Sequence, residues 1–166
     1  MPQQSELDPT LKSLWRPLRL LLAAIDADIA RIYEEAGLQG VKPSFVMELL
    51  RLDAVGSMTI TELARSVGRT HSAMSQKVSA MRRAGLVRTR PGADARSKTV
   101  VLTAKARRVV GRLAAEWRET EAALAELEAE LPYPLTAVVR DIEAALRQRS
   151  FYERVKAKLA EDPQWQ

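Results

Sequence analysis

The middle of the chain contains the pattern that most restricts the fold. Thr59 and Glu62 have the spacing of a capping box, in which each side chain bonds the other residue's backbone, so a helix begins at Thr59. Gly68 ends this helix, and Thr70 can cap the next one, which runs to Gly85. Two helices joined by a short glycine-containing turn are typical of a helix-turn-helix.

The second of these helices has two different faces. Met74, Val78 and Met81 recur at helical spacing, so we expect them to face the core. The polar residues that remain for the outer face are His71, Ser72, Ser75, Gln76, Ser79 and Arg82.

Two short strands are expected directly after this helix. Residues 86–90 and 99–102 are β-branched or alternate between apolar and polar, and Pro91-Gly92 starts the loop between them. That eight-residue loop carries Asp94, Arg96 and Lys98, and it is longer than the usual hairpin connection. The hairpin predicts a winged version of the helix-turn-helix.

Positive charge is concentrated in this part of the chain. Residues 69–112 contain 12 Lys or Arg and one acid, Asp94, whereas the rest of the chain contains 14 bases and 20 acids. The formal net charge of +5 therefore combines a segment of +11 with a mildly acidic remainder of −6. Charge segregated in this way indicates nucleic-acid binding, although on charge alone a solvated arginine-rich surface is an equal alternative.

Helices are expected on both sides of the motif. An apolar N-terminal helix runs from Asp8-Pro9 to about Ala36 and is bent or restarted at Pro17, because proline removes a backbone donor. A further helix opens at Pro43. Its apolar face is formed by Phe45, Val46, Leu49, Leu50 and Leu52.

A long helix with apolar residues at heptad spacing follows the wing. Thr103 caps it, and residues 110–131 form a seam over about three heptads before Pro132. A last helix follows, which either continues past Ser150 or restarts near it. The seam fits packing within one chain or between two. We favour a share between two chains, because two recognition helices one DNA turn apart need a rigid connector.

These elements predict a mainly α fold with a small β-hairpin wing, organised in three regions. Residues 1–40 form an N-terminal dimerisation helix region, residues 41–103 a winged helix-turn-helix DNA-binding domain, and residues 104–166 the C-terminal dimerisation helices.

Several classes of protein fit the composition poorly. The longest apolar run is the six residues 20–25, too short to span a bilayer, and residues 2–5 lack a signal-peptide pattern, so we expect a cytoplasmic protein. The chain has no cysteine and one histidine, which argues against a thiol chemistry and a histidine-based metal site. No glycine-rich phosphate loop or HExxH motif is present, so we expect no cofactor and no enzyme.

At this point the sequence resembles the MarR family of winged-helix regulators. The matching residues are Leu63-Ala64, Gly68, Thr70 to Ser75, Gly85-Leu86-Val87, Asp94-x-Arg96 and Val101-Leu102-Thr103. The order of elements on either side also matches, so the resemblance covers nearly the whole chain. Two departures are Ser97, where many members have a second acid or a glycine, and a longer C-terminal tail from Phe151.

The resemblance implies a homodimer that binds a pseudo-palindromic operator on double-stranded DNA, with repression relieved by a small ligand whose binding residues stay unknown. Dimerisation would involve the terminal helices. The residues that we expect in that interface are Leu14, Leu18, Leu21, Leu124, Leu127, Leu135, Val139, Ile142 and Leu146. Trp15 and Trp117 are core or interface residues, and candidates for a ligand pocket only through the resemblance.

The residue chemistry supports the same DNA-binding role. Residues 70–73 hold no acid, so the positive end of the second helix is open to a phosphate, and Gln76 can bond adenine through two hydrogen bonds. Arg96 lies where a wing tip enters the minor groove, with Asp94 able to orient it. The predicted DNA-binding residues are Arg69, Thr70, His71, Ser72, Ser75, Gln76, Lys77, Arg82, Arg88, Arg90, Asp94, Arg96 and Lys98.

Two other functions remain open from the sequence. One is a constitutive or architectural DNA-binding protein without a ligand, and the other is a helical adaptor whose winged helix binds protein. The adaptor would be expected to carry a neutral or acidic winged helix, contrary to the charge of +11 on residues 69–112.

Overall fold

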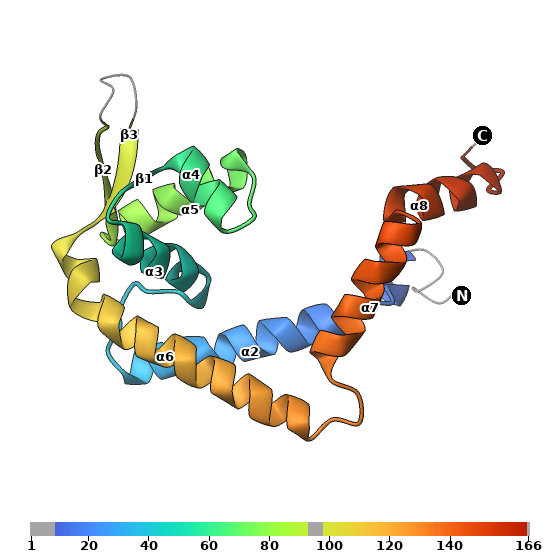
Figure 1. Ribbon diagram of the computed structural model, residues 1–166, viewed down its shortest axis with the longest axis horizontal. Helices are drawn as coiled ribbons and strands as arrows, with labels where there is room; N and C mark the ends of the chain where they lie inside the picture. Colours follow the sequence, from blue (N-terminus) through green and yellow to red (C-terminus); the bar gives the residue numbers. More distant parts are fainter. Residues whose placement is uncertain (1–8, 93–97, 166) are drawn as a thin grey trace, which may run out of the picture. The chain divides into compact units, whose positions relative to one another are not determined.

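The computed structural model describes residues 9–92 and 98–165 (Figure 1). The chain divides into two compact units, Met1–Trp117 and Arg118–Gln166. The expected Asp8 cap, together with Asp94, Arg96 and Ser97 of the wing, lies outside the described residues. The described chain is mainly helical with one small antiparallel sheet, which confirms the predicted fold class.

The first unit contains the helix-turn-helix and the wing. Its elements are η1 (Pro9–Lys12), α2 (Arg16–Glu35), η2 (Pro43–Phe45), α3 (Val46–Val55), β1 (Met58–Thr59), α4 (Ile60–Ser66), α5 (His71–Arg83), β2 (Val87–Pro91), β3 (Lys98–Leu102) and the first half of α6 (Ala104–Ala129). The rest of α6, α7 (Leu135–Gln148) and α8 (Phe151–Ala160) belong to the second unit.

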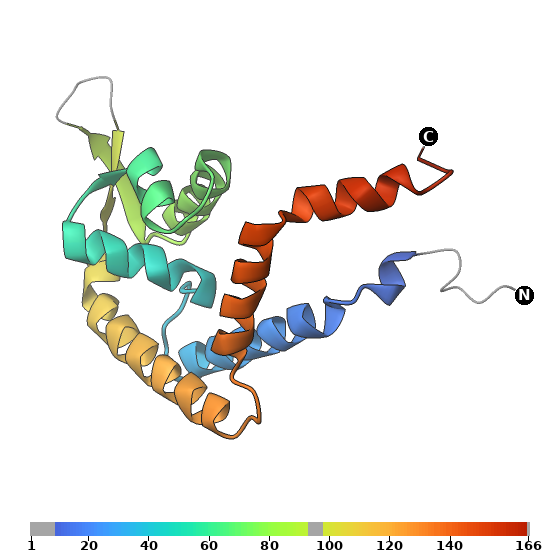
Figure 2. The ribbon, with the colours of Figure 1, turned by 45° about the vertical axis from the view of Figure 1, so that its right-hand side comes forward.

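The sheet has three strands in the order β1-β3-β2. The wing strands pair from Val87 with Leu102 to Pro91 with Lys98. Compared with the predicted ranges 86–90 and 99–102, β2 ends and β3 begins one residue closer to the loop, and β2 also begins one residue later. Strand β1 was not predicted, since two residues are too short to show an alternating pattern; Met58 pairs with Val100. In Figures 1 and 2 strands β2 and β3 lie beside helices α3 to α5.

One apolar core holds the first unit together. Leu49 and Leu52 of α3, Leu63 of α4 and Met81 of α5 are all fully buried there. The sheet and the first half of α6 close this core, with the side chains of Leu86, Val100, Leu102, Ala106 and Leu113 buried. Helix α5 is therefore packed on its inner face by elements from before and after it in the sequence.

Local capping explains where the two central helices begin. The hydroxyl Oγ1 of Thr59 accepts from the backbone N–H of Glu62 at 3.2 Å, while Glu62 Oε2 accepts from the backbone N–H of Thr59 at 2.7 Å. Thr70 Oγ1 accepts from the backbone N–H of Ala73 at 3.3 Å. Both caps confirm the predictions, because each needs only residues three positions apart. Gly68 has a φ of +63° in the turn between the helices, a conformation that favours glycine.

The N-terminal helix restarts at Pro17, one of the two alternatives that the sequence predicts. A short 3-10 helix ends at Lys12, and α2 begins at Arg16 with Pro17 in its first turn. The backbone N–H groups of a first turn have no acceptor within the helix, so the missing N–H of proline costs no hydrogen bond there. Leu14 therefore lies in the turn before α2 and not on a helix face. At the other end of the chain, Ser150 and Glu153 form a second capping box that restarts the helix as α8.

In the described part of the chain, none of the helices is long and apolar enough to cross a membrane. Within the described ranges, no three or more His, Asp or Glu side chains come together as a possible metal site.

The capping box predicts a defined pH dependence of stability. Bonds from the backbone N–H and the hydroxyl of Thr59 hold the pKa of Glu62 below its ordinary value. Ionised Glu62 therefore adds stability that is complete above the ordinary glutamate pKa and is lost as the pH falls through the lowered folded value. E62Q retains the capping geometry but does not titrate.

We expect the free energy of unfolding of the wild type, minus that of E62Q, to be constant near neutral pH and to decrease through the acid range. Chemical denaturation at a series of pH values measures this difference. A difference independent of pH would contradict the role given to the ionised Glu62.

Candidate nucleic-acid interface

Helix α5 presents a polar face to solvent and an apolar face to the core. Met74, Val78 and Met81 are buried, as predicted from their spacing. On the opposite side His71, Ser72 and Gln76 are exposed, as is Arg82 near the end of the helix, and Ser75 is half-buried. These side chains extend from a helix whose position is set by its other face, which is the arrangement a major-groove reading helix requires.

The N-terminal end of α5 is open and positive. Its first turn contains no acid, and the preceding Arg69 and the capping Thr70 are exposed. Backbone N–H groups at a helix start and the helix dipole both favour an anion. This end can therefore accept a phosphate without displacing a carboxylate.

The wing adds a row of exposed cations. Arg88 and Arg90 lie two residues apart on β2, so they point to the same face of the strand, and Lys98 begins β3. All three side chains are exposed. Among the described residues, the ion pairs involve Arg31, Lys77 and Lys158, so none of these wing cations is neutralised by a described acid.

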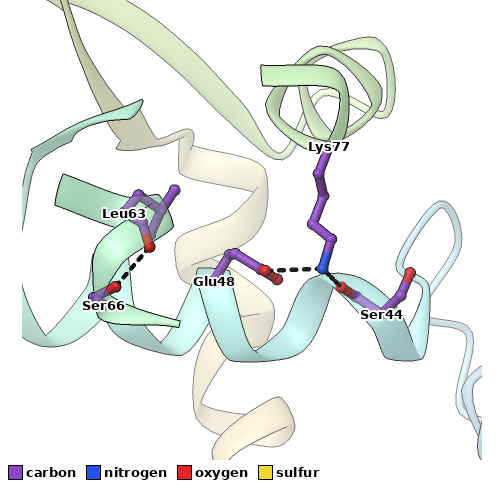
Figure 3. Close-up of polar contacts among 5 residues, drawn as sticks. All are labelled: Ser44, Glu48, Leu63, Ser66 and Lys77. Atoms are coloured by element: carbon purple, nitrogen blue, oxygen red, sulfur yellow. Dashed lines mark hydrogen bonds and ion pairs between the residues drawn. The ribbon is translucent and has the colours of Figure 1, made fainter. Parts of the chain in front are cut away.

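Lys77 departs from the prediction that it flanks the groove face. Figure 3 shows its side chain crossing from α5 to α3, where Nζ lies 2.8 Å from Glu48 Oε1 and donates to the backbone oxygen of Ser44 at 2.8 Å. The side chain of Lys77 is only 17% exposed and that of Glu48 only 1%. Lys77 is therefore removed from the candidate DNA contacts, because its amine is committed within the fold.

Glu48 is a residue that sequence reasoning missed. A signal was available, since it lies three residues after Phe45 and four before Leu52, both assigned to the apolar face of its helix. A lone acid in such a stripe indicates a buried charge with a distant partner. The identity of that partner, 29 positions away, is not readable from the spacing.

The C-terminal end of α5 is held by the start of α6. Thr103 Oγ1 donates to the backbone oxygen of Gly85 at 2.7 Å, and Lys105 Nζ donates to that of Ala84 at 3.0 Å. Thr103 also caps α6 by accepting from the N–H of Ala106 at 3.2 Å, which confirms its predicted role. The same threonine thus joins the end of α5 to the beginning of α6.

The expected heptad seam of α6 divides into two parts. In the first unit Val110 and Leu113 are buried in the core and Trp117 is partly buried against it, so this half packs within the chain. In the second unit Leu124, Leu127 and Leu131 are 37%, 46% and 44% exposed. The second half of the seam is thus left uncovered in the single chain.

Apolar residues on α7 are uncovered as well. The helix has no buried residue, and Leu135, Val138, Val139 and Leu146 are each more than a third exposed, while Ile142 is partly buried. In the first unit Leu21 is half-exposed and Leu18 partly buried on α2. All the residues predicted for dimerisation therefore retain surface that a partner could cover, which leaves that prediction in place.

Comparisons with known proteins bear on this arrangement. A family model described as HVO_A0114 matches residues 46–109, which is less than half of the chain. No curated protein sequence matches.

Solved structures match over most of the chain. The M. tuberculosis transcriptional regulator MosR in complex with DNA is 27% identical with a TM-score of 0.57, and the match covers 83% of this chain and 99% of that one. The S. aureus MepR–DNA complex is 16% identical with a TM-score of 0.61, covering 82% and 96%. A MarR protein from Peptoclostridium difficile is 17% identical with a TM-score of 0.57, covering 85% and 90%.

The chain is therefore a winged helix-turn-helix protein with the fold of the MarR-family transcriptional regulators, which confirms the resemblance found in the sequence.

The buried ion pair predicts an unequal response to single and double substitution. K77M leaves the Glu48 carboxylate buried without its partner, so we expect it to destabilise the fold by about 3–5 kcal/mol. The double variant E48M/K77M replaces the pair with apolar side chains of similar length, and we expect its free energy of unfolding to lie within about 1 kcal/mol of the wild type. Urea denaturation of both variants measures this. Equal destabilisation by the single and the double variant would contradict it.

Proposed function

We propose that this chain is a sequence-specific double-stranded DNA-binding transcriptional regulator that acts as a homodimer on a pseudo-palindromic operator. The observation that carries the proposal is the arrangement of α5. Its apolar face is buried, and its polar face with Ser72 and Gln76 is exposed. Its N-terminus can accept a phosphate, and the arginines of β2 offer further exposed positive charge. The similarity to MosR, solved in complex with DNA, supports the same use of the motif.

Different residues in this interface have different tasks. Gln76 carries an amide that can bond adenine through two hydrogen bonds in the major groove, and Ser72 lies one turn before it on the same face. Arg69, Arg88, Arg90 and Lys98 offer charge for phosphates, which gives affinity and register without reading bases. Asp94 and Arg96 are proposed for the wing tip from the sequence alone.

The homodimer is proposed from the uncovered apolar surface. Leu124 and Leu127 on α6 and Leu131 just after it form one apolar stripe, and α7 carries a second, so a single chain leaves both stripes exposed. Exposed apolar surface of this kind is typical of protein interfaces. A two-fold partner would cover these stripes and place two copies of α5 on successive turns of DNA.

Repression relieved by a small molecule is the finer part of the proposal. It follows the family resemblance, and we propose a site for the ligand in the first unit. A cleft of about 300 Å³ is lined by Met47, Leu50, Arg51 and Ala54 of α3 and by Trp117 of α6. Trp15, the other candidate, is half-exposed in the turn before α2.

Selection of bound sites from random DNA tests the whole proposal. We expect enrichment of an inverted repeat whose half-sites lie about 10 base pairs apart, one helical turn. Failure to enrich any sequence, together with binding that does not depend on salt, would overturn the DNA-binding proposal. An asymmetric site bound by a single chain would overturn the dimer.

Two substitutions separate base reading from phosphate binding on the selected operator. We expect Q76A to lose about 1–3 kcal/mol of discrimination at one base position in each half-site, with little change on random DNA. R90A should weaken binding to both DNAs and reduce the slope of log K against log salt by about one per subunit. Fluorescence anisotropy at several salt concentrations measures both effects.

Matched controls for this test are Q148A and R31A, which remove the same groups from exposed positions on α7 and α2. We expect both controls to leave the base preference and the salt slope unchanged. Equal loss on operator and random DNA for Q76A would contradict its reading role.

The dimer predicts a position-specific response to a buried charge. L127E would place two glutamates close to the two-fold axis without partners, at a cost of several kcal/mol, so we expect the dimer dissociation constant to rise about 100-fold or more. Ala122, exposed on the opposite side of α6 from the Leu124–Leu131 stripe, provides the matched control A122E. Sedimentation velocity over a concentration series distinguishes the two. Unchanged dimerisation of L127E would contradict the proposed interface.

A further inference from the structure

The reading helix is tied to α3 by a buried, directional contact. Lys77 Nζ donates to two acceptors at 2.8 Å, the Oε1 of Glu48 on α3 and the backbone oxygen of Ser44 in η2 (Figure 3). Glu48 is the buried charged residue of the described chain, and its Oε2 is also buried, with no hydrogen-bond partner among the described residues. Among the described residues, Lys77 is therefore the partner on which the Glu48 carboxylate depends.

Stability does not explain such a pair. Moving two charges from water into a core has a desolvation penalty that is about as large as the free energy gained from one salt bridge. Apolar replacements of similar volume are therefore often neutral or stabilising. In this pair the desolvation penalty is only partly offset, because Glu48 Oε2 gains no hydrogen bond from the described residues. We therefore attribute the role of this contact to the geometry that it imposes on α5 and not to its contribution to the free energy of unfolding.

Apolar packing defines the rotation of α5 about its axis less narrowly than hydrogen bonds do. The buried side chains of α5 are Met74, Val78 and Met81, and methionine is an adaptable side chain that tolerates sliding and repacking. A cation between two acceptors on another element permits one rotation and one axial position of the helix. Hydrogen bonds weaken steeply when their distance and angle change, whereas apolar contacts have no preferred direction.

The position of Lys77 makes this constraint relevant to base reading. Lys77 follows Gln76 directly, so the residue that fixes the helix lies beside the one that would read a base. A rotation of α5 about its axis would move Gln76 and Ser72 across the groove, while the arginines on β2 would keep their places.

We propose that the Lys77–Glu48 pair, with the backbone oxygen of Ser44, is a positioning device that sets the rotation of α5 and thereby the sequence discrimination of the protein. Lys77 and Glu48 act through Gln76 and its neighbours and do not contact DNA. This inference rests on the proposed DNA-binding function.

The test uses the double variant E48M/K77M in the full-length protein. It removes one positive and one negative charge, so the net charge that attracts random DNA is unchanged. We expect affinity for random DNA at a given salt concentration to stay within about twofold, and the ratio of operator to random affinity to fall about tenfold or more. Circular dichroism and thermal unfolding establish that the variant is folded.

The matched control is K158Q/E161Q, which removes the exposed ion pair of α8 and is also neutral in net charge. We expect it to leave both affinities unchanged. If E48M/K77M does not fold, K77R replaces it, since a planar guanidinium keeps the charge but cannot reproduce the contacts of a compact ammonium. For K77R we expect the same loss of discrimination with random-DNA affinity retained.

A folded double variant, or K77R, with the wild-type ratio of operator to random affinity overturns the inference. An equal fall in both affinities overturns it as well, since that result assigns the pair to general stability or phosphate binding. Failure of the proposed function is distinguishable, because the wild-type protein would then show no operator preference to lose.

Discussion

The structure of the winged helix-turn-helix depends on how helix α5 is held. Its apolar face is buried against α3, α4 and the sheet, Lys77 ties its middle to Glu48, and Thr103 and Lys105 bind the carbonyls at its C-terminal end. A helix secured on one side and at one end can present its opposite face to a partner at small entropic cost, because most of its ordering has already occurred on folding. The N-terminus of α5, which Thr70 caps, belongs to the same exposed surface.

The distribution of charge follows from this packing. Of the cations between residues 69 and 112, the structure uses some internally: Lys77 in the ion pair, Lys105 at the end of α5, and Arg112, which donates to the backbone oxygen of Ala36 at 2.8 Å. Others, such as Arg88 and Arg90, remain exposed on the wing. A high count of cations in a segment therefore overstates the number available to phosphates, because bonds within the fold already engage some of them.

Much of this arrangement was predictable because it is local. The starts of α4 and α5 depend on Thr59 and Thr70 bonding residues three positions away, and the buried side of α5 follows from helical spacing. Strand β1 was missed because its pairing partner, Val100, lies far along the chain. The sequence left a bend or a restart of the N-terminal helix open at Pro17, and the structure shows the restart, because proline favours a helix start over a helix interior.

The sequence by itself determined the order of the elements, the two faces of α5 and the family resemblance, since capping and periodicity act within a few residues. Only the tertiary structure decided that the amine of Lys77 is paired with Glu48 within the fold, and that the heptad seam is covered near Leu113 but open at Leu127. The physical reason is the same in both cases. Whether a charge is paired or an apolar side chain is covered depends on groups brought together by folding, and their separation in sequence carries no local signal.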